Sequence, residues 1–276
     1  MARINTLGNF LTDVADAIRE KKGTTDTILA SNFDTEIASI ESGGDINEYL
    51  SDTITSGNNS LGGWTKTIKK MRSPLTVEGT SAEYMFYNCP VNELPQLDTS
   101  NVTNMSHMFT SCTNLTTIPQ INTSNVTNMS LMFASCANLT TIPQLDTSNV
   151  TDMSNMFSGC RKITTIPQLN GEKLINVYRN FYSCTSLENF NGLINLGQEF
   201  STSQNANYYN YTLDLSSSTS LTEQSIINIL NNLYDIATKG CNTQTVTLGA
   251  TNLAKLTSTE GQQALASAQS KGWNVA

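Results

Sequence analysis

Six cysteines and a single histidine are the residues of this 276-residue chain whose types could support metal, redox or nucleophilic chemistry. Five of the cysteines are separated by 23, 24, 24 and 24 residues: Cys89, Cys112, Cys136, Cys160 and Cys184. A zinc site is not expected, because the chain has no Cys-x-x-Cys pair and no second histidine. Consecutive cysteines could lie close enough for a disulfide, but five cannot all pair. We therefore predict a column of buried free thiols.

The other candidates for chemistry are also isolated. His107 has no second histidine for a catalytic triad, and we interpret it as an exposed, variable position. Asp98 and Asp146 alternate with Asn122 and Asn170 at 24-residue intervals. Carboxylates two repeats apart would lie about 10 Å from each other, too far to share one ion. The chain also has no glycine-rich phosphate loop. We therefore predict that the protein is not an enzyme and that it binds no cofactor and no metal.

The regular spacing of the cysteines comes from a sequence repeat, and the structure of this repeat must position the cysteines, the histidine and the Asp and Asn residues named above. Residues 112–135 and 136–159 are identical at 17 of 24 positions. A fixed period of this length is typical of a solenoid, in which each repeat forms one coil and buries its apolar side against its neighbours. Two apolar groups recur in each repeat and should point inward. In one repeat they are Leu115, Ile118 and Ile121, and then Val126, Met129, Met132 and Phe133.

Each coil should contain one short strand, expected at residues 114–118 and their equivalents. A proline cannot donate a hydrogen bond to a strand ladder, so it should mark the end of that strand. These prolines are Pro95, Pro119, Pro143 and Pro167. The repeated Thr, Ser and Asn side chains can close tight turns by bonding to the backbone. If the coils stack in register, the repeated asparagines should form a ladder along the stack: Asn101, Asn125 and Asn149.

The repeated motif resembles a known family. Asp-Thr-Ser-Asn-Val-Thr-Asn-Met-Ser-x-Met-Phe-x-x-Cys-x-x-Leu-Thr-x-Ile-Pro is similar to the BspA-like leucine-rich repeat, in the variant common in Gram-positive surface proteins and phage-encoded proteins. The resemblance covers residues 81–196 and weakens at Pro90-Val91, Asn180 and Asn191, as expected of terminal repeats. It implies an α/β fold: a leucine-rich-repeat-like β-solenoid of about five coils of 24 residues, with an N-terminal helical module and a strand-helix C-terminal cap.

Residues 1–43 form the predicted N-terminal module. Its first helix, residues 2–22, places five apolar residues along one seam: Ile4, Leu7, Leu11, Val14 and Ile18. The seam either packs on the next helix or mediates docking and self-association. Residues 7–42 resemble an N-terminal module of tail and fibre proteins from phages of Gram-positive bacteria, which implies attachment to other virion proteins and a homo-oligomer. Residues 44–80 would follow as a linker and N-terminal solenoid cap.

After Cys184 the period fails, and residues 197–276 should form a C-terminal repeat cap. A loop rich in Asn, Ser and Tyr comes first, including Tyr208 and Tyr209, and it either packs on the solenoid or binds carbohydrate. Thr222 should cap a helix to residue 237, and Thr257 with Glu260 should form a capping box for a helix to residue 270. Strands are expected at residues 211–215, 244–248 and 273–276.

Composition limits the possible partners and locations. Charged residues make up 14% of the chain, against about 25% in typical soluble domains. The net charge of −8 argues against nucleic-acid binding. No stretch is apolar enough to span a membrane, so no membrane partner is expected. Residues 1–22 are amphipathic rather than continuously apolar, so we expect no signal peptide. These features are compatible with a virion protein made in the host cytoplasm.

The predicted ligand face lies on the strand side of the coils, where hydroxyl and amide groups recur in register. It contains Asn92, Glu93, Gln96, Thr116, Thr117, Gln120, Thr140, Thr141, Gln144, Thr164, Thr165 and Gln168. Such an array suits a repeating glycan, with weak contacts adding up across copies.

We therefore predict a phage virion protein, of the tail, baseplate or fibre, whose solenoid binds a glycan or a protein on the host cell surface. Two alternatives stay open: a virion structural or decoration protein without a ligand, and a bacterial surface adhesin. Exposed aromatic or irregular residues on one surface would favour a binding role over a structural one.

Overall fold

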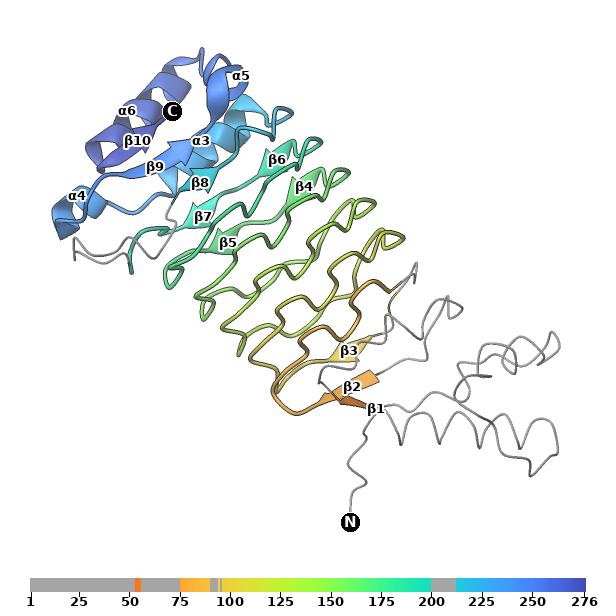
Figure 1. The fold of residues 1–276 in the computed structure, drawn as a ribbon. Coiled ribbons are helices and arrows are strands. Elements are labelled where there is room, and N and C mark those ends of the chain that lie inside the picture. The colour runs from red at the N-terminus through yellow and green to blue at the C-terminus, as the bar shows by residue number, and fades with distance from the viewer. Residues whose placement is uncertain (1–52, 56–74, 90–93, 95, 200–211) are drawn as a thin grey trace, which may run out of the picture.

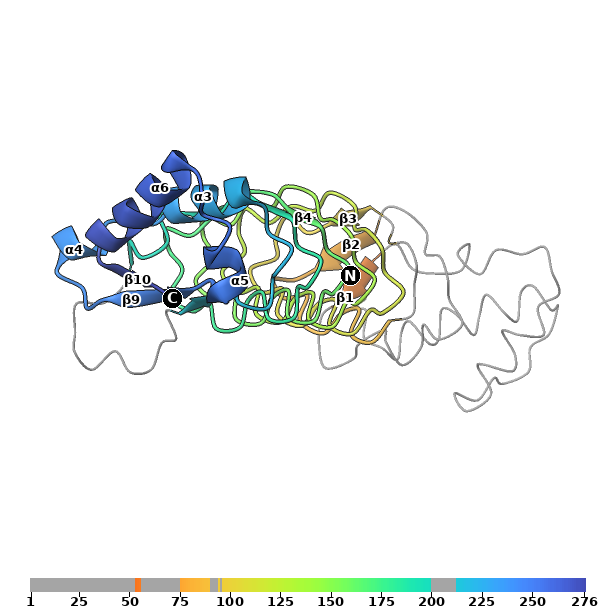
Figure 2. The same cartoon turned by 90° about the horizontal axis from the view of Figure 1, so that it is seen from above.

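The computed structural model describes residues 53–55, 75–89, 94, 96–199 and 212–276. In this part of the chain the repeats form a stack of coils, with successive turns side by side (Figure 1). Backbone N–H groups of each coil donate to carbonyl oxygens one repeat away, as from Met129 to Asp152 at 2.9 Å and from Thr140 to Thr116 at 3.0 Å. Seen from above, the coils overlap one another in projection (Figure 2). The assignment of this stack to the leucine-rich-repeat-like β-solenoids stays a prediction.

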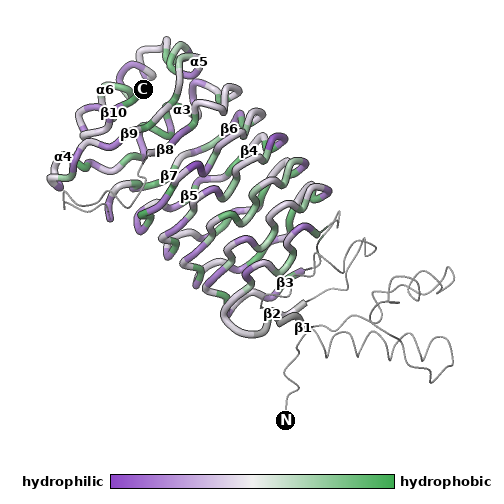
Figure 3. Tube along the Cα trace, viewed as in Figure 1, coloured by the Kyte–Doolittle hydropathy of each residue, from purple (hydrophilic) through white to green (hydrophobic). Residues whose placement is uncertain are grey.

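A column of stacked phenylalanines forms the centre of the core: Phe86, Phe109, Phe133, Phe157 and Phe181, all fully buried. Their neighbouring ring centroids are 5.3, 5.5, 5.7 and 5.8 Å apart, and the rings are within 12° of parallel. The side chains predicted to point inward are also buried, so the predicted inward face is confirmed. Hydrophobic and hydrophilic residues alternate along each coil (Figure 3).

The five cysteines of the repeat are buried and free, which confirms the predicted thiol column. The Sγ atoms of four of them lie 2.9–3.1 Å from the carbonyl oxygen of a phenylalanine in the preceding coil, to which the thiols donate. The column therefore joins neighbouring coils by weak hydrogen bonds as well as by packing.

Regular strands are shorter than expected. β4 (Thr165–Ile166) pairs in parallel with β6 (Asn189–Phe190), and β5 (Leu169–Asn170) pairs with β7 (Leu193–Ile194). The strand expected at residues 114–118 is not formed. A proline in each coil lacks the N–H that a longer ladder would need, so pairing there is limited to one or two residues.

Polar residues close the opposite wall of each coil. Asn104, Asn128, Asp152 and Asn176 are joined by isolated parallel bridges between coils. The Oδ1 atom of Asn128 accepts a hydrogen bond from the backbone of Ser130 at 2.9 Å, and the equivalent bonds recur in neighbouring coils. The Met-Phe-x-x-Cys segment then turns the chain back, with two residues per coil at positive φ.

The predicted asparagine ladder takes a different form. Asn125 and Asn149 do not bond to each other. Their Nδ2 atoms each donate to a serine carbonyl of the preceding coil, Ser100 and Ser124, both at 2.8 Å. The backbone carbonyls of a neighbouring coil lie in register with these amides, so each asparagine bonds to backbone.

At the N-terminal end, β1 (Thr53–Thr55), β2 (Leu75–Glu78) and β3 (Leu97–Asp98) form a parallel sheet in that order. The predicted N-terminal module, with its seam residues Ile4, Leu7, Leu11, Val14 and Ile18, lies outside the described residues. No helix among the described residues is both long enough and apolar enough to cross a membrane.

The hydrogen-bond ladder continues beyond the last predicted repeat. Thr164 donates to Thr140, Glu188 to Thr164 and Thr222 to Glu188, each at 3.0 Å. Ser218 therefore occupies the position that Cys184 holds one coil earlier, 34 residues away instead of 24. The 24-residue period therefore fails after Cys184, as expected, but the hydrogen-bond ladder between coils continues. One further coil ends at Ser218 after this ten-residue lengthening, and residues 200–211 of the interval lie outside the described part of the chain.

The C-terminal unit covers the end of the stack. β8 (Leu213–Asp214), β9 (Gln244–Thr247) and β10 (Trp273–Val275) form a parallel sheet in the order β10-β9-β8. α3 (Glu223–Asn231) packs on α6 (Thr259–Ser270), and these helices lie on the opposite side from β9 and β10 (Figure 2). Two short helices complete it: α4 (Ile236–Lys239) and α5 (Gly249–Leu253).

Two helix boundaries differ from the prediction. Thr222 is the N-cap of α3, as expected, but this helix ends at Asn231 and not at residue 237. Asn231 and Asn232 are weak helix formers, and Asp235 caps the separate helix α4. The predicted Thr257–Glu260 capping box is wrong, because Ser258 is the N-cap of α6 and accepts a hydrogen bond from Gly261 N at 3.0 Å.

Candidate functional site

An open groove of ≈ 860 Å³ runs across four successive coils and is lined in part by residues of β5 and β7. It is lined by Gln120, Ile121, Asn122, Thr123, Ser124, Gln144, Leu145, Asp146, Thr147, Gln168, Leu169, Asn170 and Ile194. The Ile and Leu residues of this set are largely buried in the core, whereas the amide and carboxylate side chains are partly or fully exposed. The groove therefore offers a polar, repetitive surface.

Asn122, Asp146 and Asn170 occupy equivalent positions along the groove. The Oδ1 atom of each accepts a hydrogen bond from the backbone N–H two residues later, at 3.0, 3.0 and 2.8 Å. These turns hold the side chains in one orientation. The second polar atom of each side chain has no hydrogen bond to any described residue. In register, the three positions present an amide donor, a carboxylate acceptor and a second amide donor.

The hydrogen bonds of its turn keep Asp146, the middle of these three residues, in the charged form. The hydroxyl and the backbone N–H of Ser148 donate to the Asp146 carboxylate at 2.7 and 3.0 Å, and these bonds lower the pKa of Asp146. Asp146 is therefore ionised at neutral pH, with neutral asparagines on both sides.

The glutamines of the groove connect neighbouring coils. Gln120 Nε2 donates to the Gln144 carbonyl at 2.9 Å, Gln144 Nε2 to the Gln168 carbonyl at 2.7 Å, and Gln168 Nε2 to the Asn191 carbonyl at 3.4 Å. Their amide donors are thus occupied by structural bonds. Within the part of the chain that the structure describes, the Oε1 atoms of Gln120 and Gln144 accept no hydrogen bond, so they remain available to a ligand.

Two buried threonines support this arrangement from below. Thr147 Oγ1 donates to the Asn170 carbonyl at 2.9 Å and accepts from the Asn170 backbone N–H at 2.7 Å. Thr123 Oγ1 accepts from the Asp146 backbone N–H at 2.8 Å. These bonds fix the backbone of each groove residue relative to the coil before it.

The structure divides the predicted ligand face into two parts. Gln120, Gln144 and Gln168 line the groove. The threonines are exposed but do not line it: Thr116, Thr117, Thr140, Thr141, Thr164 and Thr165. The Thr140 and Thr164 hydroxyls donate to the carbonyl of the preceding coil at 3.1 and 3.4 Å. Gln96 is exposed but outside the groove, and Asn92, Glu93, Tyr208 and Tyr209 lie outside the described residues.

Asn122, Asp146 and Asn170 were not predicted as ligand-face residues, because the carboxylates at this position, Asp98 and Asp146, were considered only as possible ligands of one ion. Their alternation at 24-residue intervals was the signal that could have identified a ligand surface. Among the residues that the structure describes, no group of three potential metal ligands occurs. His107 is half-buried and stacks on Tyr84 with ring centroids 4.4 Å apart, so it is not the exposed position that was expected.

We expect the five column thiols to resist alkylation in the native protein at pH 8. Burial raises the pKa of Cys184 to about 12 and the pKa of Cys160 well above its usual range, and the thiolate is the reactive species. Cys241 is only half-buried and serves as the internal control. Intact-mass spectrometry after iodoacetamide treatment should show modification of Cys241 first and of the other five only in denaturant. Equal rates at Cys160 and Cys241 in native protein would contradict the burial of the column.

Comparison with known proteins gives one match. Residues 80–196 match the DUF285 family model. That family is described as a Mycoplasma protein of unknown function. The DUF285 region coincides, to within one residue at its start, with the predicted BspA-like region at residues 81–196, and the match is consistent with such a repeat. The chain matches no curated protein and no solved structure. All residues that line the groove lie inside the DUF285 region.

Proposed function

We propose that this protein is a non-enzymatic binding protein that recognises a surface glycan through the groove in its DUF285 region. The observation that carries the proposal is the register of unpaired polar atoms in that groove. Asn122, Asp146 and Asn170 alternate donor and acceptor on successive coils, whose stacked phenylalanine rings have centroids 5.3–5.8 Å apart. A polymer with regularly spaced hydroxyl groups can both donate and accept at such an array.

Preorganisation supports this proposal. The Oδ1 atoms are held by turns, and the glutamine amides are held by the next coil, so a ligand would order few side chains on binding. The groove is open and shallow, which suits one side of a chain-like ligand better than an enclosed small molecule. Each contact would be weak, and several copies of the protein would bind tightly through multivalency.

The finer part of the proposal is that the protein belongs to a phage virion, in the tail, baseplate or fibre, and binds a Gram-positive host. It is supported by the resemblance of residues 7–42 to the N-terminal modules of such proteins. Mass spectrometry of purified particles should then find the chain as a virion component. A bacterial surface adhesin is the alternative if the chain is found on cells and absent from particles.

The test of the binding site uses an exchange that the chain itself suggests. The double variant N122D/D146N moves the carboxylate by one coil, keeps the net charge, and keeps an Oδ1 acceptor for both turns. We expect it to weaken binding to wall glycans extracted from Gram-positive cells by tenfold or more, because donor and acceptor are interchanged. Calorimetric titration of the full chain measures this change.

The triple variant T116A/T140A/T164A is the matched control, since it alters exposed threonines outside the groove and, like the exchange, keeps the net charge. We expect it to bind as the unchanged protein does. Loss of binding in the threonine variant alone would place the site on the threonine surface. Absence of binding to any wall glycan would overturn the proposal and favour the alternative of a structural or decoration protein.

A further inference from the structure

A second surface, away from the groove, is distinguished by its charge. From residue 73 to residue 160 the sequence contains no Lys and no Arg. Four cations then follow within 19 residues: Arg161, Lys162, Lys173 and Arg179. The next Lys or Arg is Lys239. Positive charge in the stack is therefore concentrated on its last two predicted coils, in a protein with a net charge of −8.

Arg179 is held between two exposed tyrosines. The guanidinium carbon lies 5.1 Å from the ring centroid of Tyr178 and 5.3 Å from that of Tyr182. The two tyrosines are 38% and 50% exposed. Stacking on aromatic faces fixes a guanidinium while its N–H donors, which lie in its plane, stay accessible. Arg179 forms no hydrogen bond or ion pair with any described residue, so all of its N–H donors are available.

Two more cations lie on the adjacent coil. Gly159 N donates to the Tyr182 carbonyl at 2.8 Å, and Arg161 N donates to the Gly159 carbonyl at 2.9 Å. Arg161 and Lys162 therefore come two and three residues after Gly159, whose backbone is hydrogen-bonded to the turn that carries the tyrosines. Both are exposed, and neither side chain forms an ion pair within the described ranges. We call Arg161, Lys162, Tyr178, Arg179 and Tyr182 the basic tyrosine patch.

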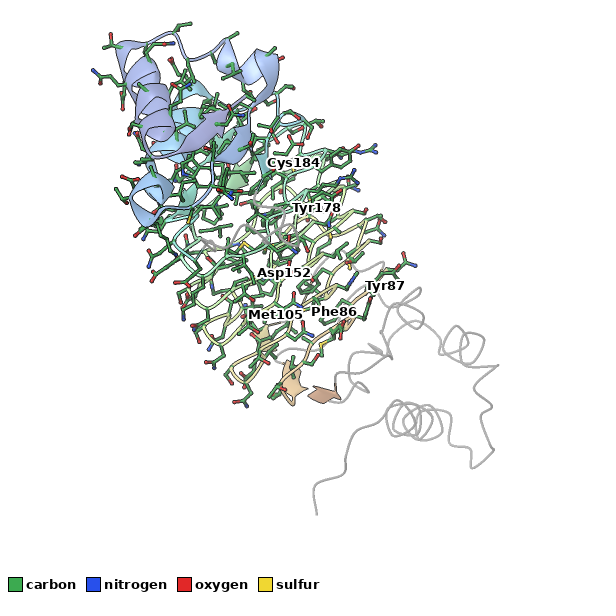
Figure 4. The ribbon with its side chains drawn as sticks, turned by 60° about the vertical axis from the view of Figure 1, so that its left-hand side comes forward. Phe86, Tyr87, Met105, Asp152, Tyr178 and Cys184 are labelled. Atoms are coloured by element: carbon green, nitrogen blue, oxygen red, sulfur yellow. The ribbon has the colours of Figure 1, made fainter. Side chains whose placement is uncertain are left out.

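The same turn departs most strongly from the repeat. Figure 4 labels Tyr178 and Cys184, with which this turn begins and ends. The patch residues Tyr178, Arg179 and Tyr182 replace Ser154, Asn155 and Ser158 of the preceding coil. The buried Asn180 replaces a methionine in this turn, and neither of its side-chain polar atoms has a hydrogen-bond partner among the residues that the structure describes. Departures from local folding rules are expected where function requires them.

We propose that the basic tyrosine patch binds the anionic groups of a charged glycan. A fixed guanidinium with free in-plane donors matches the two oxygens of a carboxylate or a phosphodiester. The flat, half-exposed tyrosine rings can pack on the apolar faces of sugar rings, which an acidic peptide does not offer. Tyrosine and arginine are also the residue types that dominate binding energies at interfaces. The proposal deepens the proposed function, on which it rests for the glycan nature of the ligand.

The repeat supplies a variant for the test that should fold. Y178S/R179N/Y182S replaces the three patch residues of this turn with those of the preceding turn, where Asn155 has φ 53° against 51° at Arg179. The full chain is titrated by calorimetry with a phosphodiester-linked glycan, a polyuronate, a neutral dextran and poly-glutamate. We expect both anionic glycans to bind at least tenfold more tightly than dextran, with an affinity that falls as salt is raised. The variant should lose this difference.

R179K is the second variant, because it keeps the charge but loses the planar donor group, and it should lose most of the preference. A variant that keeps the full preference for anionic glycans would overturn the patch as their site. If poly-glutamate binds as tightly as the anionic glycans and the triple variant abolishes both, the ligand of the patch is an acidic protein and not a glycan.

The groove exchange N122D/D146N separates the two sites: it should weaken the binding of dextran and of the anionic glycans by the same factor. If no glycan binds at all, both proposals fail. If dextran binds and charge adds nothing, only the patch proposal fails.

Discussion

Replacing Phe133 with alanine should lower the free energy of unfolding by about 3–5 kcal/mol. The ring is fully buried, and it stacks on Phe109 at 5.5 Å and on Phe157 at 5.7 Å. Its removal would leave a cavity in the middle of the column and would take away contacts on both sides. Neighbouring coils could not close the gap without breaking the hydrogen bonds that hold them in register. Urea denaturation followed by circular dichroism measures the change.

The control for this variant is Thr117→Ala, an exposed change in the same coil, which should alter stability by less than about 0.5 kcal/mol. A loss below about 1 kcal/mol for Phe133→Ala would show that the column does not carry the core. Because a repeat stack need not unfold in one step, the denaturation curve should be recorded with two probes. Tryptophan fluorescence reports on the surroundings of Trp64 and Trp273, and circular dichroism reports on the whole chain.

Replacing Asn180 with methionine should raise the free energy of unfolding by about 1–3 kcal/mol. Asn180 is 1% exposed, and its Oδ1 and Nδ2 atoms both lack partners among the described residues. The preceding coils hold Met108, Met132 and Met156 at this position. The substitution would continue their column and remove two buried polar atoms that have lost their hydrogen bonds to water.

The reciprocal change, Met156→Asn, is the matched control and should destabilise the protein by a similar or larger amount. If Asn180→Met is neutral or destabilising, then Asn180 is satisfied by water or by a ligand that reaches the turn. Glycan titration of the same variant gives a second measurement. Weaker binding of anionic glycans with higher stability would show that the asparagine is retained for the patch at the expense of folding.

The core could be predicted from the sequence because every coil repeats the same apolar positions. The buried sets around Phe133 and the cysteines follow from a 24-residue period and require no knowledge of the loops. The additional coil that ends at Ser218 could not be predicted, because its ten extra residues remove the periodic signal. The coil is identified by the backbone hydrogen bond from Thr222 to Glu188, and the types of these residues do not predict that bond.

The groove that we propose as the binding surface was predicted less well than the core, for a different reason. A sequence shows which polar side chains recur, but not which of their atoms are already bonded. Threonines and glutamines were expected to act together. In the structure, the hydroxyls of Thr140 and Thr164 and the glutamine amides mostly serve neighbouring coils. The free atoms belong to Asn122, Asp146 and Asn170, whose first oxygens are held in turns.

The hydrogen bonds between coils connect equivalent atoms, from Thr140 to Thr116 and from Thr164 to Thr140, and from four of the column cysteines to a phenylalanine of the coil before each. A duplicated block of 24 residues would therefore find the same partners on both of its sides. Duplication or loss of such blocks changes the length of the molecule without a new folding problem, and stability changes in nearly equal steps. Each added block also extends the groove by one more Asn or Asp. The length of the stack and the length of polymer that the proposed site could contact can thus evolve together, through a single kind of genetic event.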